Sequence, residues 1–157
     1  MSNLVAIREK IVEEKQYIVF SLNEESFGID ISDVNSIIMM PKITSVPMTE
    51  DYISGIINLR GRIVPILSMH KRMKRGEDVI TKDSRVIILN LEDDKLLGII
   101  VDDVKEVMNI SSEEIEEPNE YLKKDDSFIS GVGKKDDDLI SIFEVNSITD
   151  PSALEVG

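Results

Sequence analysis

The sequence predicts a mostly β protein in which two similar small modules pack side by side. Three observations favour this fold: one stretch of the chain occurs twice, each copy consists of short β-rich runs, and polar turns join these runs. Five or so short strands per half are too few for a large sandwich but suit a small closed β-barrel. Short helices are expected between strands and in the terminal segments.

The repeat defines the domain organisation. Residues 52–56 (Tyr-Ile-Ser-Gly-Ile) recur as residues 128–132 (Phe-Ile-Ser-Gly-Val), 76 positions later. Upstream, Gly28 matches Gly98 with an offset of 70, so copy two is six residues longer in its middle, as loops allow. This period is too long for a solenoid repeat. We expect a single domain over residues 1–157, with repeats at 16–70 and 85–146 and terminal segments at 1–15 and 147–157.

Three β-hairpins are predicted from β-rich runs on either side of polar turns. The expected strand pairs are residues 17–22 with 27–31, 85–91 with 96–101, and 53–59 with 63–69. The third hairpin encloses the Arg60-Gly61 turn.

Short helices are expected after the first hairpin of each copy, where the apolar spacing changes. Ser32 can cap one of them, and Asp102 or Asp103 can cap the other. Their apolar faces would consist of Val34, Ile37 and Ile38 in copy one, and of Val104, Val107 and Met108 in copy two. Further helical segments are indicated by Leu4, Ile7 and Ile11, by Asp150-Pro151, and by a capping box of Ser111 with Glu114.

Composition and the N-terminal sequence limit the cellular compartments in which the protein is expected. The chain has no cysteine, which excludes a disulfide framework, a thiolate metal site and a cysteine nucleophile, and suits a reducing cytoplasm. Its first residues lack the basic start and long apolar run of a signal peptide, and no segment approaches a membrane-spanning length. We therefore expect a soluble cytoplasmic protein without direct membrane insertion.

Charge is distributed unevenly along the chain. The net charge of −13 argues against wholesale nucleic-acid binding, because a phosphate backbone requires a basic surface. Residues 52–76 nevertheless contain no acid and hold six of the eighteen Lys and Arg residues. This basic window is either a solvated loop and helix end or a contact for an acidic protein partner.

The residues offer little support for catalysis. His70 is the only histidine, and a lone histidine is more often structural or exposed than catalytic. The chain lacks a Gly-x-Ser-x-Gly nucleophile motif and the glycine-rich loops that cradle phosphates. Its acidic runs lack the spacing of a calcium-binding loop and are typical of solvated surface. We expect no enzyme activity, no cofactor and no metal site.

The two copies differ most in one turn. Residues 58–62 read Asn-Leu-Arg-Gly-Arg, whereas residues 134–138 read Lys-Lys-Asp-Asp-Asp. The counterpart of Arg60 is Asp136, so the shared frame does not require an arginine there. This turn is therefore the leading candidate for partner recognition.

The segment at residues 55–66, Gly-Ile-Ile-Asn-Leu-Arg-Gly-Arg-Ile-Val-Pro-Ile, resembles the Gly-Val-x-Asn-Leu-Arg-Gly-x-Ile-Val-Pro pattern of the CheW family of chemotaxis adaptors. Residues 16–31 and 97–104 also resemble their CheW counterparts, and the resemblance extends from about residue 16 to residue 150. It implies two five-stranded SH3-like β-barrels. It also implies a non-catalytic adaptor that couples methyl-accepting chemoreceptors to the histidine kinase CheA in signalling arrays.

The resemblance also implies contact residues. The receptor tip would dock in an apolar groove between the barrels, on Val34, Gly55, Asn58, Arg60, Val104 and Val107. The valines have the alternative of being core residues, and Gly55 that of a backbone requirement, which its counterpart Gly131 favours. The regulatory domain of CheA would bind around Ser84, Arg85 and Val86.

One segment departs from the family pattern, and two other functions stay open. The family commonly continues Pro-Val-Ile-Asp-Leu, whereas this chain reads Pro65-Ile66-Leu67-Ser68-Met69-His70. The departure loses an acid and leaves the effect on partners undetermined. The nearest alternative is the CheW-like portion of a CheV or CheA protein, disfavoured by the lack of a receiver or kinase segment after residue 150. A small-ligand-binding or metal-dependent enzyme is the alternative from another class.

Overall fold

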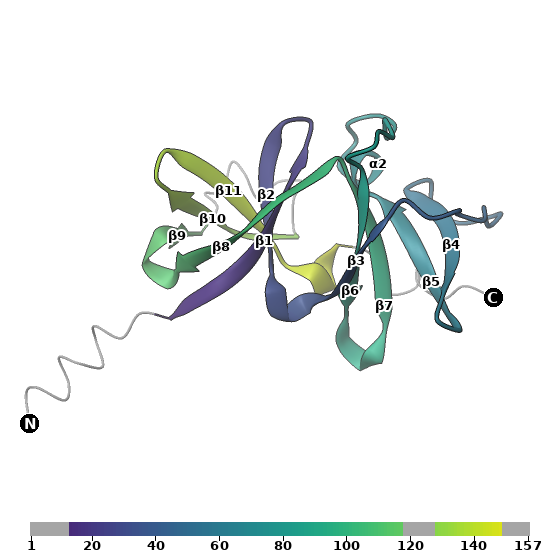
Figure 1. Cartoon of the computed structure of the whole chain (residues 1–157), viewed down its shortest axis with the longest axis horizontal. Coiled ribbons are helices and arrows are strands. Elements are labelled where there is room, and N and C mark those ends of the chain that lie inside the picture. Colours follow the sequence, from purple (N-terminus) through teal and green to yellow (C-terminus); the bar gives the residue numbers. More distant parts are fainter. Residues whose placement is uncertain (1–12, 118–127, 149–157) are drawn as a thin grey trace, which may run out of the picture.

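The computed structural model describes residues 13–117 and 128–148. Within them the chain forms two sheets, which lie side by side in Figure 1. The elements are β1 (Glu14–Leu22), β2 (Glu25–Asp30), η1 (Ile31–Asp33), β3 (Val34–Met39), β4 (Ile53–Leu59), β5 (Arg62–Ser68), α2 (Met69–Arg72), β6 (Arg85–Asn90), η2 (Glu92–Asp94), β7 (Leu96–Val101), β8 (Asp103–Ser111), η3 (Ser112–Glu114), β9 (Ile115–Glu116), β10 (Ile129–Lys135), β11 (Asp138–Phe143) and η4 (Val145–Ser147). The predicted terminal helical segments, at Leu4, Ile7, Ile11 and Asp150-Pro151, lie outside the described residues.

Both sheets have the same strand arrangement. Sheet 1 has the order β8-β1-β2-β11-β10-β9, and sheet 2 has the order β3-β6-β7-β5-β4. The mostly β fold and all three predicted hairpins are confirmed. Sheet 1 has six strands instead of the expected five, because its closing segment is regular enough to form the two-residue strand β9.

The two sheets agree with the predicted pair of small barrels, but each sheet is built from strands of both copies of the repeat. Sheet 2 combines β3, β4 and β5 of copy one with β6 and β7 of copy two, and sheet 1 combines β1 and β2 of copy one with β8–β11. The copies are joined by two parallel strand pairs, β2 with β11 and β5 with β7. The exchange follows from short connections, because only Asp102 separates β7 in one sheet from β8 in the other. Each copy therefore contributes strands to both sheets, and neither can form its sheets alone.

The repeat is visible in the backbone as well as in the sequence. Ser68 donates its backbone N–H to the carbonyl of Tyr52 at 2.8 Å, and Glu144 donates to the carbonyl of Phe128 at 2.6 Å. The two donors, Ser68 and Glu144, are 76 residues apart in the sequence, and so are the two acceptors, Tyr52 and Phe128. The offset read from the sequence therefore describes equivalent positions in space.

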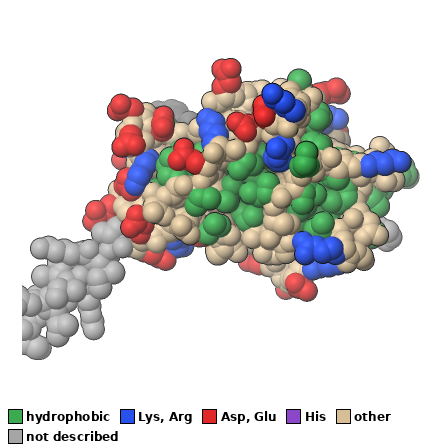
Figure 2. All heavy atoms as spheres, in the orientation of Figure 1, with side chains coloured by type: hydrophobic (Ala, Val, Ile, Leu, Met, Phe, Trp, Pro, Cys, Tyr) green, Lys and Arg blue, Asp and Glu red, His purple; other side chains and the backbone are tan. Residues whose placement is uncertain are grey.

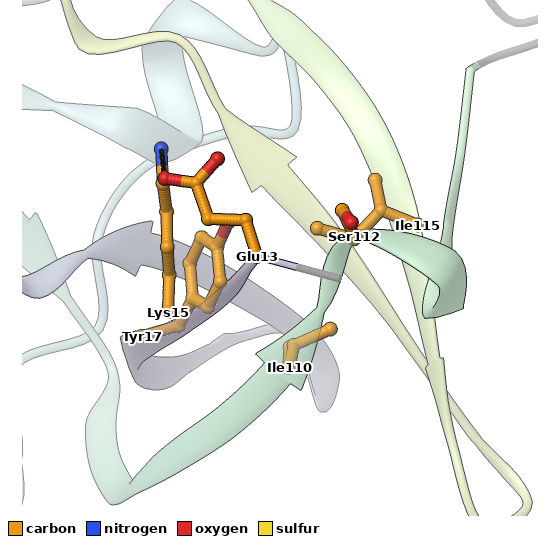
Figure 3. A pocket seen from close by; sticks show the side chains of 6 residues that line it. All are labelled: Glu13, Lys15, Tyr17, Ile110, Ser112 and Ile115. Carbon is orange, nitrogen blue, oxygen red and sulfur yellow. Dashed lines mark ion pairs between the residues drawn. The ribbon is translucent and has the colours of Figure 1, made fainter. Parts of the chain in front are cut away.

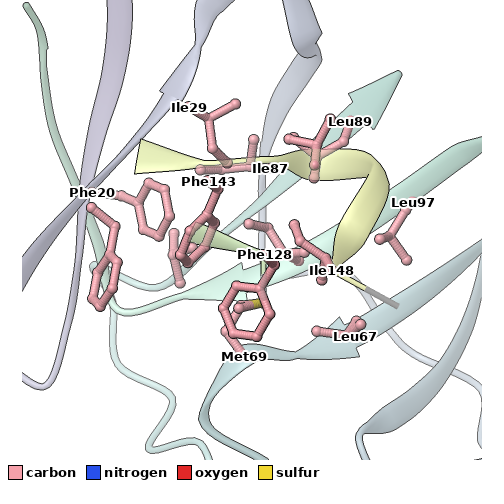
Figure 4. Close-up of a cluster of buried hydrophobic side chains, with 14 of the residues drawn as sticks. Phe20, Ile29, Leu67, Met69, Ile87, Leu89, Leu97, Phe128, Phe143 and Ile148 are labelled. Atoms are coloured by element: carbon pink, nitrogen blue, oxygen red, sulfur yellow. The ribbon is translucent and has the colours of Figure 1, made fainter. Parts of the chain in front are cut away.

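The main hydrophobic core lies between the two sheets (Figure 4). Phe20 and Phe27 of sheet 1 pack with Phe143, whose ring centroid lies 5.5 Å from that of Phe128. The side chains that sheet 2 and α2 contribute are Ile53, Leu67, Met69, Ile87, Leu89, Leu97, Ile99 and Val101. Each sheet also encloses a smaller core of its own. Because the largest cluster needs both sheets, burial of apolar surface fixes one sheet against the other.

Candidate functional site

The segments after the first hairpins are strands with bulges, not helices. A register shift in β3 pairs Val34 with Leu89 and Ser36 with Ile88, which leaves Asn35 as the extra residue. The same shift in β8 pairs Val104 with Phe20 and Glu106 with Val19, which leaves Lys105 extra. A β-bulge of this kind places residues i and i+3 on one face of a strand, a spacing that resembles a helix. The predicted helices are therefore wrong.

The predicted caps of those helices have other tasks. Asp30, not Ser32, caps the short η1 turn, and its carboxylate accepts the backbone N–H of Ser32 at 2.9 Å. Asp103 begins β8. Burial raises the pKa of the Asp33 carboxyl, and the carboxylates of Asp30 and Glu144 act in the same direction. The start of β3 is therefore bordered by acidic groups.

Both bulged strands expose apolar residues. Val34 and Val104 are half-buried and pack against the central core, so they are partly core residues. Val107 is 49% exposed, and Ile37, its counterpart at an offset of 70, is 39% exposed. The list of predicted contact residues omitted Ile37, although comparing the two copies could have found it. Figure 2 shows hydrophobic side chains gathered over the middle of the face crossed by β3 and β8, with Lys and Arg at its edges.

The Asn58–Arg62 turn presents Arg60 to solvent. Arg60 has φ 51° and Gly61 has φ 87°, so both central residues of this two-residue hairpin are left-handed. The side-chain oxygen of Asn58 accepts the backbone N–H of Gly61 at 2.8 Å and fixes the turn. Asn58 thus supports the turn from within. Among the described residues, none forms a hydrogen bond or ion pair with the Arg60 guanidinium.

Gly55 is buried at the point where sheet 2 closes. The segment after β3 returns to β4 through one bridge, in which Thr44 and Ile56 exchange backbone hydrogen bonds of 2.8 and 2.9 Å. A Cβ on Gly55 would lie 2.2 Å from the carbonyl oxygen of Thr44, and its φ of 151° is itself unfavourable for other residues. The glycine is therefore required by the backbone, and any receptor contact there would be indirect.

The structure brings together only some of the predicted receptor residues. Arg60 lines a notch with Asn35, the neighbour of Val34, so the turn and the start of β3 meet at one end of sheet 2. Val104 and Val107 lie on β8 in sheet 1. The two groups belong to the two sheets that flank the central apolar face.

The basic window divides into structural and unpaired cations. The guanidinium of Arg72 lies 4.9 Å from the Phe128 ring centroid and donates to the carbonyl of Ile148. Arg75 pairs with Glu25 at 2.8 Å. These two arginines therefore have partners within the described chain, whereas Arg60 and Lys74 are exposed.

The predicted kinase residues lie at the start of β6. Ser84 is buried, and its hydroxyl accepts the backbone N–H of Thr81 at 2.8 Å. Val86 is fully buried inside sheet 2. Arg85 is half-buried, and its cross-strand neighbour Met39 on β3 is 72% exposed. Exposed surface in this region therefore comes from Arg85 and Met39, with Ser84 and Val86 beneath it.

The departure at Ser68 to His70 has a structural explanation. The hydroxyl of Ser68 accepts the backbone N–H of Lys71 and caps α2, a task that aspartate also performs. His70 is buried, and its Nε2 lies 2.6 Å from a carboxylate oxygen of Asp102. The other oxygen of Asp102 accepts the backbone N–H of Asn23 at 2.8 Å. The only histidine thus connects α2 to the β1–β2 turn through Asp102.

A small hollow lies at the far end of β1, away from the Arg60 turn (Figure 3). Its volume is about 230 Å³, and its lining residues are Glu13, Lys15, Tyr17, Ile110, Ser112 and Ile115. Lys15 lies between the carboxylates of Glu13 and Asp30, at 3.7 and 3.6 Å, which raise the pKa of its ammonium group. Burial, followed by the Asp30 carboxylate, raises the pKa of Tyr17. The hollow is smaller than typical small-molecule sites, which begin at about 300 Å³.

The described residues also bear on metal binding and on membrane crossing. Within residues 13–117 and 128–148, no three His, Asp or Glu side chains come together in a group that could hold a metal ion. In the same part of the chain, no helix has the length and apolar character needed to cross a membrane.

Comparison with known proteins identifies the relatives of this fold. The CheW-like domain family matches residues 16–152. The Bacillus subtilis chemotaxis protein CheW is 36% identical over 137 residues, which cover 87% of each chain. The Treponema pallidum CheW is 30% identical over 148 residues, covering 91% of this chain and 86% of that protein. The crystal structure of the scaffolding protein TtCheW from Thermoanaerobacter tengcongensis superimposes with a TM-score of 0.83 at 37% identity, covering 94% of this chain and 95% of that one.

Proposed function

The chain belongs to the CheW-like domain family, and we propose that it is a non-catalytic adaptor that couples chemoreceptors to the histidine kinase CheA in the cytoplasm. One observation carries the proposal: the turn that distinguishes copy one from copy two presents Arg60 in a notch with Asn35 of β3, the strand that also carries the exposed Ile37. A partner on the central apolar face would bury Ile37 and Val107 and pair with Arg60. Buried apolar contacts would supply most of the affinity, and the charge would set orientation.

Two separate surfaces suit two partners. The receptor would bind the face that combines Val34, Asn58 and Arg60 with Val104 and Val107, above the frame that Gly55 maintains. The kinase would bind near Arg85 and Met39, supported from beneath by Ser84 and Val86. Arg60 and Arg85 lie on different elements, whereas Ile37 and Met39 lie on the same side of β3, so the two surfaces adjoin there. An adaptor requires that both partners bind at once.

The proposal is tested by a three-component binding experiment. The purified chain is mixed with a chemoreceptor cytoplasmic-tip fragment and the CheA regulatory domain, and complexes are measured by sedimentation velocity. We expect binary complexes with each partner and a ternary complex. A folded chain that binds neither partner would contradict the proposed function.

A charge reversal separates the two surfaces. Arg60→Asp should abolish receptor binding while kinase binding and the melting temperature stay within error, because an exposed charge contributes little to folding. Lys74→Asp is the matched control, since Lys74 is also exposed, basic and left-handed, with φ 58°. It should leave both interactions unchanged. A loss of the cooperative melting transition in Arg60→Asp would show that Arg60 is structural.

A further inference from the structure

A notch of about 190 Å³ lies beside the β4–β5 turn. Its lining residues are Asn35, Leu59, Arg60, Arg62 and Leu96. We propose that this notch binds one carboxylate side chain of a partner, held between the guanidinium groups of Arg60 and Arg62. The inference rests on the proposed function, because the carboxylate is an aspartate or glutamate of the receptor tip. Under this proposal, Arg62 contributes to the selection of the receptor.

Arg62 is positioned independently of any partner. One of its guanidinium nitrogens donates to the backbone carbonyl of Asp94 at 2.7 Å, which connects the β4–β5 turn to the β6–β7 turn. Arginine has five N–H donors in a fixed planar arrangement, so this bond leaves others free. An arginine that is already held loses less entropy when it binds a carboxylate.

The backbone of Arg60 gives an independent indication. Three two-residue hairpin turns of the described chain have a left-handed residue at their first position, and these residues are Asn23, Arg60 and Asp136. Asparagine and aspartate tolerate this conformation, whereas a long side chain without local hydrogen bonding does not gain from it. Arg60 is thus the one long side chain among the three.

The size and chemistry of the notch define its occupant. About 190 Å³ is below the range of small-molecule sites, about 300 Å³ and above, but accommodates a single side chain. Leu59 and Leu96 provide an apolar lining that would strengthen a charge-assisted bond by excluding water. The exposed acidic residues of η2, Glu92–Asp94, border the same turn and would repel a polyanion. The surroundings therefore favour one carboxylate over a phosphate-rich ligand.

The second copy lacks such a site. At the positions equivalent to Arg60 and Arg62 it has Asp136 and Asp138. A carboxylate ligand would be repelled there, so the site occurs once although the frame occurs twice.

Titration calorimetry with the receptor-tip fragment tests the inference. Arg62→Lys keeps the charge and a donor for the Asp94 carbonyl but cannot form two parallel bonds to a carboxylate. We expect its affinity to fall about fivefold, that of Arg62→Gln about tenfold, and the melting temperatures to stay unchanged. Lys95→Gln removes an exposed cation from the neighbouring turn and serves as the control, with less than a twofold change expected.

A double-mutant cycle identifies the occupant. Each acidic residue of the fragment is changed to its amide and titrated against the wild-type chain and Arg62→Gln. One amide should abolish the effect of Arg62→Gln, and the others should leave it intact. The inference would be overturned if both Arg62 variants bound the fragment with wild-type affinity, or if the coupling were spread evenly over all of its acidic residues. In either case a loss of binding in Arg60→Asp would still support the proposed function. If the wild-type chain did not bind the fragment, the proposed function would be contradicted, and so would the assignment of the notch to a receptor carboxylate.

Discussion

The β4–β5 and β10–β11 hairpins have the same frame but use their charges differently. In copy two, Lys134 pairs with Glu116 at 2.9 Å and Lys135 pairs with Glu114 at 3.5 Å, so the hairpin is attached to the segment that closes sheet 1. In copy one, the equivalent closure is a single bridge beside a hollow of about 500 Å³. The cations of its turn, Arg60 and Arg62, form no ion pair with any described residue.

The difference lies in which charges of the two hairpins are paired inside the molecule. Charges that pair internally stabilise closure, and the backbone N–H of Ser111, with Lys135, keeps the pKa of Glu114 below its ordinary value. Charges without internal partners are available to another protein. Copy two therefore closes its sheet with two ion pairs, whereas copy one closes through a single bridge and, among the described residues, the cations of its turn form no ion pair.

The largest expected effect concerns the core that both copies share. Leu67 and Phe143 are equivalent, 76 residues apart, and both are buried between the sheets. Leu67→Ala and Phe143→Ala should each lower the free energy of unfolding by about 2–5 kcal/mol, because each leaves a cavity in the same cluster. Each variant should unfold in one cooperative transition.

Guanidinium denaturation followed by circular dichroism and by tyrosine fluorescence measures these values. Coincident transitions would show that the two sheets unfold together. Separate transitions, with one sheet persisting after the other has melted, would contradict a shared core.

A smaller effect is expected at the two glycines of the closing segments. A Cβ on Gly55 would lie 2.2 Å from a backbone oxygen, whereas one on Gly131 would lie 2.7 Å from a methyl carbon of the Ile115 side chain and 3.1 Å from the backbone oxygen of Glu116. Gly55→Ala should therefore cost about 3 kcal/mol, and Gly131→Ala about 1 kcal/mol, because a side chain can move aside more easily than a backbone. Thermal melting of both variants measures the difference. Equal costs would show that the two closures are equally adaptable.

Much of the fold could be predicted from the sequence, because hairpins leave local signals. The runs on either side of Arg60-Gly61 are rich in β-branched residues, and the offset of 76 matched equivalent backbone bonds. The exchange of strands between copies could not be predicted, since periodicity indicates which face of a strand is buried and not which sheet it joins. The bulges at Asn35 and Lys105 could not be predicted either, because the apolar residues around them have a spacing of i and i+3, which is also typical of a helix.

The candidate site was predictable only where the copies differ. Arg60 stood out because its counterpart is Asp136, and the structure gives it an exposed, unpaired guanidinium within the described chain. The burial of Gly55, Ser84 and Val86 depends on long-range packing, which a family motif does not encode. Ile37 could have been included from the sequence, because it is the counterpart of Val107 at the offset of 70.

The smallest expected effect compares two ties between the sheets. Residues 70 and 146 are equivalent: His70 reaches the β1–β2 turn through Asp102, whereas Asn146 accepts the backbone N–H of Glu92 in the β6–β7 turn at 2.9 Å. His70→Ala should lower the free energy of unfolding by about 1–3 kcal/mol, because it removes a buried, charge-assisted partner, and Asn146→Ala by about 0.5–1 kcal/mol. Thermal melting at pH 7 measures both, with His70→Gln as the conservative variant, whose amide can still donate to Asp102. If Asn146→Ala cost more than His70→Ala, the tie through the carboxylate would be the weaker of the two, and the asymmetry between the copies would be confined to the hairpin turns.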